Sequence, residues 1–233
     1  GDSYVDHPSF GTAIVSRVLE SHGYRVCILP QPQCDADFLQ FGAPRLAFYI
    51  NGGNIDSMVA HYTAAKRKRS DDAYTAGGRS GKRPDRAVTV YTQTVRRLFG
   101  DIPIAIGGLE ASLRRFAHYD YWDDAVHPSV LISSGADLLM YGMGEKHIAQ
   151  LAHRLNGGKA ITEITDIKGT CYKIKSSEYT PIGGAKECPS FEMIKGTDEK
   201  SKRQYAISCK IQQTEQDAVI GKTIIQKHGD YIV

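Results

Sequence analysis

The sequence has no long hydrophobic run and no paired cysteines. No segment approaches the ~18 consecutive apolar residues that a membrane-spanning helix requires. The residues 1–4 also lack the basic-then-apolar order of a secretory leader. The cysteines number five, and none forms a C-x-x-C pair, so neither a disulfide framework nor a zinc knuckle is indicated. These absences predict a cytoplasmic protein with reduced thiols and no membrane partner.

The composition is that of a folded globular protein. Of the 233 residues, 41% are hydrophobic and 24% are charged, which suffices for one sizeable core, or for a core with a small appended unit. The formal net charge of +3 is unevenly distributed. Basic residues outnumber acidic ones between Lys66 and Arg86, and we call this stretch the basic loop.

Helices and strands are predicted to alternate along the first two thirds of the chain. This alternation is typical of a parallel sheet covered on both faces. We therefore expect a doubly wound, mostly parallel, Rossmann-like α/β domain over residues 1–158. The helices are expected at 12–20, 55–62, 87–99, 109–116 and 145–155, and the strands at 24–29, 44–50, 102–106, 130–132 and 137–141.

The first predicted helix leads directly into the strand 24–29, and a helix followed by a strand is half of a βαβ unit. The strand that completes the unit is therefore expected before Gly1.

The character of the sequence changes beyond Gly158. A strand is expected at 169–174, a polar helix at 198–213, and a hairpin of 223–228 with 231–233 about Gly229-Asp230. Residues 159–233 are therefore predicted to form an α+β connector.

Three loops are candidates for ligand contact, because ligands in open α/β sheets bind beyond the carboxyl ends of the strands. Each loop also has a purely structural interpretation: a helix cap with a first-turn proline in the first loop, and glycines required by tight helix–strand packing in the other two. The candidate ligand-contacting residues are Asp6, His7, Gly11, Gly107, Gly108, Glu110, Gly142, Gly144 and Glu145.

Taken together, these loops resemble the cobalamin-binding-like domain that precedes the barrel in many radical SAM proteins. Longer strings resemble the N-terminal region of the YgiQ-type radical SAM family more specifically, and the resemblance extends over essentially the whole chain. The strings are Tyr4–Gly11, Ser70–Tyr74, Gly81–Arg86, Gly107–Trp122 and Gly221–Gly229.

The resemblance implies a later barrel domain of the same chain that holds a [4Fe–4S] cluster through a C-x-x-x-C-x-x-C motif and binds S-adenosylmethionine. This sequence contains no such motif, so the cluster ligands are expected beyond Val233. We expect the fragment to have no catalytic residues of its own and to be inert, whereas the full-length protein is an enzyme of unknown substrate.

Cobalamin is the second cofactor that the resemblance raises. The lower-ligand pattern of cobalamin domains is Asp-x-His-x-x-Gly, whereas Asp6 directly precedes His7 here and Gly11 follows four residues later. We expect a domain that retains the fold without the cofactor.

The alternative is a non-catalytic nucleic-acid-binding module, in which the basic loop contacts RNA phosphates and aromatic residues elsewhere in the chain stack on bases. These aromatic residues are Phe116, Tyr119, Tyr121 and Trp122, which follow Arg114 and Arg115. The competing structural interpretation pairs the arginines with Asp120, Asp123 and Asp124, which lie among those aromatic residues. The candidate RNA contacts are Lys66, Arg67, Lys68, Arg69, Arg114 and Arg115.

The histidines His61, His118 and His127 raise the question of a metal site. No spacing places two of them on one helix face with a carboxylate, so no metal site is predicted.

Overall fold

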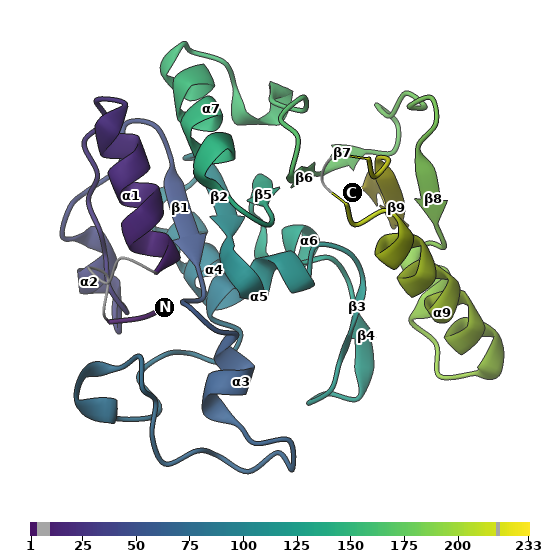
Figure 1. Ribbon diagram of the computed structural model, residues 1–233, viewed down its shortest axis with the longest axis horizontal. Helices are drawn as coiled ribbons and strands as arrows, with labels where there is room; N and C mark the ends of the chain where they lie inside the picture. Colours follow the sequence, from purple (N-terminus) through teal and green to yellow (C-terminus); the bar gives the residue numbers. More distant parts are fainter. Residues whose placement is uncertain (4–9, 218–219) are drawn as a thin grey trace.

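The computed structural model describes residues 1–3, 10–217 and 220–233, and Figure 1 shows their arrangement. Candidate residues Asp6 and His7 lie outside the described residues. The chain folds as a mixed α/β protein with parallel and antiparallel sheets and no barrel among the described residues.

The central sheet has four strands in the order β1-β2-β5-β6. Strands β1, β2 and β5 run parallel, and β6 pairs with β5 in the antiparallel direction. Because β6 lies beyond Gly158, this sheet includes a strand from the predicted connector. The strands are β1 (Phe48–Asn51), β2 (Ile104–Gly107), β5 (Leu138–Met140) and β6 (Thr170–Tyr172).

Helices cover both faces of this sheet, and each face has its own hydrophobic core. On one face, α1 (Gly11–Ser21) packs beside α7 (Glu145–Asn156), and Leu138 joins Ile148 and Leu151 of α7. On the other face, Ile104 and Ile106 pack against α4 (Ala87–Phe99) and α6 (Val130–Ser134).

The predicted helix 87–99 is confirmed as α4. Val88, Tyr91 and Val95 recur at helical spacing, and all three are buried against the sheet. The C-terminal cap is Gly100, which adopts a positive φ of 65°. The other confirmed helices that shape the carboxyl edge are α3 (Ser57–His61) and α5 (Gly108–Leu113).

The described residues from Ile174 to Val233, which we call the C-terminal unit, contain a second sheet in the order β7-β10-β9-β8. The predicted polar helix is confirmed as α9. Gln226 is fully buried and anchors this unit, because its side chain accepts a hydrogen bond from Ala117 N–H at 2.8 Å and donates to Pro189 O at 2.9 Å. The predicted hairpin is confirmed as β9 and β10. The elements are β7 (Ile174–Lys175), β8 (Lys186–Cys188), α8 (Phe191–Ile194), α9 (Glu199–Thr214), β9 (Ile224–His228) and β10 (Tyr231–Ile232).

Two predicted strands are wrong. Residues 130–132 lie in α6, since the Ser129 side chain caps the helix through Leu131 N–H and Gly135 ends it at a φ of 79°. Residues 24–29 form no strand, because no described strand pairs with them.

Several short elements were not predicted. They are too short for a clear hydrophobic period, and their shape depends on contacts with distant residues. They are α2 (Asp35–Leu39), the 3-10 helices η1 (Ala76–Gly78) and η2 (Ile161–Glu163), the hairpin of β3 (His118–Asp120) with β4 (Ala125–His127), and β8 and α8 of the C-terminal unit. No helix among the described residues is long and apolar enough to cross a bilayer.

Candidate functional site at the carboxyl ends of the parallel strands

The loops that follow β1, β2 and β5 meet at one edge of the central sheet, at the lower side of Figure 1. We call this edge the carboxyl edge. It contains residues 52–56, 107–110 and 141–145, and the last two stretches are two of the three predicted candidate loops. In parallel sheets this edge is where ligands bind.

Glu110 lies buried at the centre of the carboxyl edge. Its Oε2 accepts a hydrogen bond from Ser57 N–H at 2.9 Å, and its Oε1 accepts one from Val88 N–H at 2.8 Å. These donors belong to the first turns of α3 and α4, whose N–H groups have no partners within the helices. Glu110 therefore joins two helix N-termini, a role that the sequence did not reveal because its partners lie far away in the chain.

The glycines around Glu110 allow backbone segments to approach closely. A Cβ on Gly52 would lie 2.5 Å from Glu110 Oε2, and one on Gly107 would lie 3.2 Å from Met140 O. Gly108 has a φ of +80°, and a Cβ there would lie 3.2 Å from Asn51 Cβ. The Gly107-Gly108 pair thus meets the packing requirement that the sequence offered as its structural interpretation.

The third loop is more open. Gly142 has a φ of +71°, and a Cβ there would meet nothing within 4 Å. Gly144 precedes α7 and accepts a hydrogen bond from Ile148 N–H, and Glu145 adds a negative charge to the first turn. The remaining candidate, Gly11, is the exposed first residue of α1 and also has open space around it.

A buried ion group ties the basic loop to the carboxyl edge. The Arg83 guanidinium has no exposed surface, contacts Asp2 and Asp72 at 3.1 Å each, and donates to Gly52 O at 2.9 Å. Asp72 also accepts hydrogen bonds from Tyr74 N–H and from the Thr75 hydroxyl. Because Arg83 is committed to these contacts, it is not available to a nucleic acid.

Most of the predicted RNA contacts also have partners within the protein. Lys66 donates to Trp122 O at 3.2 Å, and Arg69 donates to Val59 O at 3.1 Å. Arg114 pairs with Asp56, and Arg115 donates to Ser112 O at 2.8 Å.

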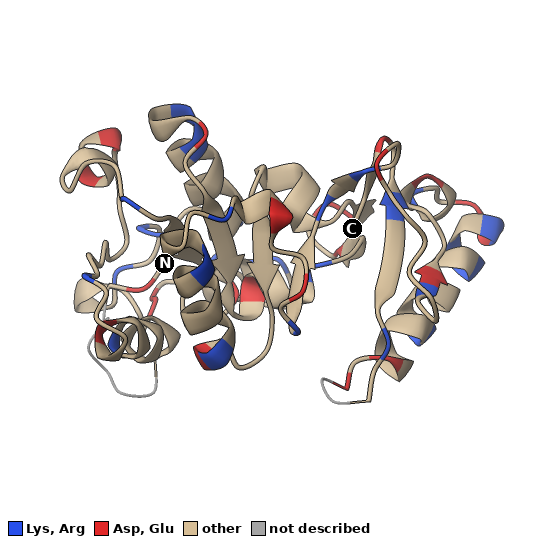
Figure 2. Ribbon diagram, turned by 90° about the horizontal axis from the view of Figure 1, so that it is seen from above, with Lys and Arg blue, Asp and Glu red and all other residues tan. Residues whose placement is uncertain are grey.

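The remaining two, Arg67 and Lys68, are exposed. Figure 2 shows basic and acidic residues interspersed over both units of the protein. Along the described backbone, basic residues are therefore not separated from acidic ones.

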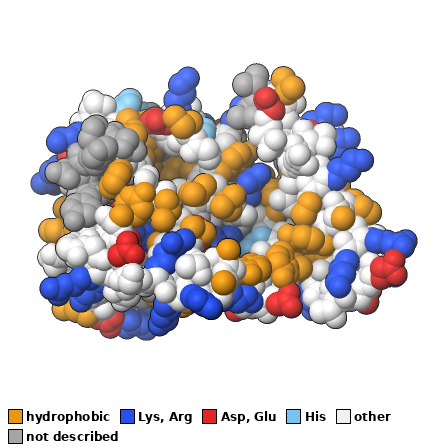
Figure 3. All heavy atoms as spheres, turned by 60° about the horizontal axis from the view of Figure 1, so that its bottom comes forward, with side chains coloured by type: hydrophobic (Ala, Val, Ile, Leu, Met, Phe, Trp, Pro, Cys, Tyr) orange, Lys and Arg blue, Asp and Glu red, His pale blue; other side chains and the backbone are white. Residues whose placement is uncertain are grey.

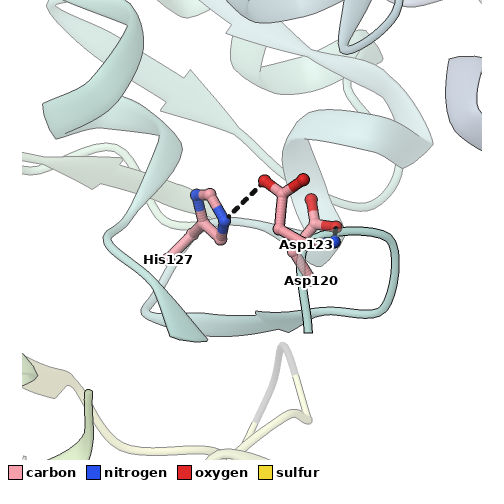
Figure 4. A group of neighbouring side chains, drawn as sticks. All are labelled: Asp120, Asp123 and His127. Carbon is pink, nitrogen blue, oxygen red and sulfur yellow. Dashed lines mark hydrogen bonds and ion pairs between the residues drawn. The ribbon is translucent and has the colours of Figure 1, made fainter. Parts of the chain in front are cut away.

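The β3–β4 hairpin brings Asp120, Asp123 and His127 together, as Figure 4 shows. Their possible metal-ligating atoms lie within 4.8 Å of one another. The Arg86 guanidinium contacts Asp120 at 2.9 Å and Asp123 at 2.7 Å, and His127 contacts Asp123 at 2.9 Å. The aspartates thus pair with an arginine, as the structural interpretation proposed, but with Arg86. The Arg86 guanidinium already supplies the positive charge that these two carboxylates face, so we assign no metal to this group.

Arg86 connects this hairpin to the start of α4. Arg86 has a φ of 51°, a conformation that side-chain-bearing residues rarely adopt, and it precedes α4. Burial opposes the ionisation of Asp120, but hydrogen bonds from Asp123 N–H and Arg86 outweigh it and lower the pKa of Asp120. The hairpin is thereby held against the start of α4.

The buried His61 lies beside the basic loop. Its Nδ1 contacts Asp85 at 2.6 Å, and the Tyr62 hydroxyl donates to the same carboxylate at 2.7 Å. Partial burial opposes ionisation of Asp85, but these hydrogen bonds prevail and lower its pKa. His118 lies in β3, and burial lowers its pKa to about 4.

The family model described as Radical SAM N-terminal matches residues 1–233. A UPF0313 protein of Clostridium botulinum (strain 657 / Type Ba4) is 52% identical over 236 residues, which cover 100% of this chain and 36% of the relative. A UPF0313 protein of Methanocella arvoryzae is 50% identical over 235 residues, which cover 100% of this chain and 38% of the relative. The chain therefore spans little more than a third of these relatives. No solved structure matches it.

Proposed function

Because the chain belongs to the radical SAM N-terminal family, as the N-terminal region of a UPF0313-type protein, we propose that it is the accessory front domain of a radical SAM enzyme. The match over the whole chain carries this proposal. In it, the remainder of the same protein supplies a [4Fe–4S] cluster that binds S-adenosylmethionine and cleaves it reductively to a radical. The substrate is not specified by the family, because function resides in sites placed on folds.

The cysteines of this chain do not fit a cluster site. A [4Fe–4S] cluster requires converging thiolates, but the one group of three possible metal ligands among the described residues contains no cysteine. Burial also raises the pKa of the Cys171 thiol to about 12, which disfavours its thiolate. We therefore place the cluster in the remainder of the protein, and the five cysteines here, Cys27, Cys34, Cys171, Cys188 and Cys209, have no part in holding it.

An exposed apolar surface at the carboxyl edge supports packing against that remainder. Leu109 and Leu113 of α5 are 48% and 61% exposed, and Met143 in the loop after β5 is 79% exposed. Figure 3 shows hydrophobic side chains gathered over this side of the molecule. Exposed apolar patches of this kind mark interaction sites. We propose that this surface faces the barrel of the same chain and closes a cleft with it.

The finer features of this proposal concern the fold and the second cofactor. We propose that the central sheet is a Rossmann-like, cobalamin-binding-like domain without cobalamin, since the sequence Asp6-His7 departs from the Asp-x-His-x-x-Gly pattern of the lower ligand. The internal contacts of Lys66, Arg69, Arg114 and Arg115 give no support to the alternative nucleic-acid module.

A substitution in the apolar surface tests the proposal in the full-length protein. Leu113→Glu places a charge on the proposed contact with the barrel, and Val90→Glu on the exposed side of α4 is the matched control. Under reducing conditions with S-adenosylmethionine, we expect cleavage to fall in Leu113→Glu and to be unchanged in Val90→Glu. Equal cleavage by both variants and the unmodified protein would argue against the contact, and no cleavage by any of them would argue against the radical chemistry itself.

A further inference from the structure

Strand β1 is an edge strand of the central sheet, and some of its backbone N–H and C=O groups point outward, away from β2. Phe48 N–H donates to Pro103 O at 2.9 Å, so the backbone groups of Phe48 face β2. Because these groups alternate in direction along a strand, those of Tyr49 and Asn51 face outward. No strand among residues 1–3, 10–217 and 220–233 pairs with that side.

The burial of β1 differs from that of its neighbours. All four residues of β1 are only half-buried, whereas Ile104–Ile106 of β2 and all of β5 are buried. Inner strands of a parallel sheet covered by helices are buried on both faces. The side chains of Phe48, Tyr49 and Ile50 are therefore as exposed as is expected in a strand that has no neighbour on one side.

Residues 24–29 have the side-chain pattern of a strand in the same sheet. Tyr24 and Val26 pack against the core under α1 and α7, whereas Leu29 packs against the core on the opposite face. Side chains that alternate between the two faces place a segment in the plane of a sheet. The segment nevertheless joins no ladder among the described residues.

Gly1 already makes one bond of the kind that a parallel neighbour of β1 would make. Its nitrogen donates to Asn51 O, an outward-facing carbonyl, at 3.0 Å. A Cβ on Gly1 would clash with Gly52 O, so Gly1 lies close against the end of β1. The N-terminal nitrogen of Gly1 therefore lies at the outer edge of β1.

We propose that the outer edge of β1 binds a parallel strand formed by the residues that directly precede Gly1 in the full-length protein. This strand lies between β1 and residues 24–29 and gives both of them a partner. The helix α1 follows this strand in the chain and becomes the crossover helix to residues 24–29, as in doubly wound folds.

The bond between Gly1 and Asn51 fixes the register of this strand. In a parallel ladder, each outward-facing residue of β1 bonds to two residues of its neighbour that are two positions apart. The residue two positions before Gly1 therefore donates to Tyr49 O and accepts from Asn51 N–H. The inference does not depend on the proposed radical chemistry, because it concerns only how the sheet is completed.

Hydrogen exchange at single-residue resolution in the full-length protein tests the inference. The amides of Phe48 and Ile50 bond to β2 and serve as internal references. We expect the exchange rates of the Tyr49 and Asn51 amides to lie within about tenfold of the rates of these references. Exchange rates more than about 100-fold higher than those of the references would overturn the proposal. Protection that increases with protein concentration would assign the strand to a second copy and would also overturn it.

A substitution separates the proposed register from general burial. Proline at the residue two positions before Gly1 removes the N–H that donates to Tyr49 O. We expect exchange of the Tyr49 and Asn51 amides to accelerate at least about tenfold, while Phe48 and Ile50 change little. Unchanged exchange at all four amides would contradict the register, and if this variant does not fold, the exchange of the unmodified protein still decides.

Discussion

The Glu110 carboxylate accepts a hydrogen bond from Val88 N–H at 2.8 Å and thereby ties the loop after β2 to the first turn of α4. Its other oxygen bonds to Ser57 N–H at the start of α3. One buried side chain thus fixes the positions of three elements at the carboxyl edge. Because the carboxylate of Glu110 faces two helix N-termini, the free N–H groups of those helices stabilise its charge.

We expect Glu110→Gln to destabilise the protein by about 1–3 kcal/mol, since the amide turns a donor toward one of the two backbone N–H groups. The midpoint of urea unfolding of the full-length protein measures this effect. Glu178→Gln, at an exposed position, is the matched control and should leave the midpoint unchanged. Equal midpoints for the two variants would show that the capping role is wrong.

We expect substitution of Arg83 to destabilise the protein more than substitution of an exposed arginine. Arg83→Met leaves the carboxylates of Asp2 and Asp72 buried without their cation, which costs about 3–5 kcal/mol. Arg79→Met changes an exposed arginine in the same loop and should cost little. Thermal unfolding of both variants compares them, and a similar loss in each would contradict the buried ion group.

Arg86 should control the order of the β3–β4 hairpin. Removing its guanidinium in Arg86→Ala breaks the contacts to Asp120 and Asp123, and we expect faster proteolysis within residues 118–127. The control is Arg97→Ala, which removes an exposed pair with Asp35, and exposed pairs contribute roughly 0–1 kcal/mol. If both variants are cleaved at the rate of the unmodified protein, the hairpin does not depend on Arg86.

Acidification should destabilise the C-terminal unit through His228. Burial lowers the pKa of His228 to about 4, below the ordinary value of about 6.5 expected in the unfolded chain. The unfolded state therefore binds the proton more readily, and the stabilisation present above about pH 6.5 is lost as the pH falls toward 4.

The replacement His228→Phe removes this titration and keeps a ring stacked on Phe191. We expect the free energy of unfolding of this variant to depend less on pH between 4 and 6.5, by up to about 1.4 kcal/mol per pH unit. His22→Gln changes an exposed histidine and should keep the original pH dependence. An identical dependence in both variants would contradict the buried, neutral state of His228.

Regular hydrophobic spacing made much of the fold predictable. The spacing of Val88, Tyr91 and Val95 predicted α4 correctly, because tertiary packing uses the same face that the sequence pattern defines. Residues 130–132 are apolar at every position, so the sequence did not distinguish a strand from a helix, and the capping residues Ser129 and Gly135 decided the outcome.

The candidate site was less predictable, because its geometry depends on residues that are distant in sequence. The place of Glu110 after two glycines predicts a ligand contact, whereas its bonds to Ser57 and Val88 join three separate elements. The sequence shows Arg83 as one charge of the basic loop, and no residue near it in the chain indicates that Asp2 and Asp72 enclose it.

The most direct test of the proposed function is anaerobic iron and sulfide analysis of the full-length protein beside the 233-residue chain. The proposal predicts about four iron and four sulfide per full-length chain and none in the 233-residue chain, since one [4Fe–4S] cluster is placed in the remainder of the protein. Iron and sulfide bound by the 233-residue chain would contradict the placement of the cluster, and their absence from both proteins would contradict the radical SAM function.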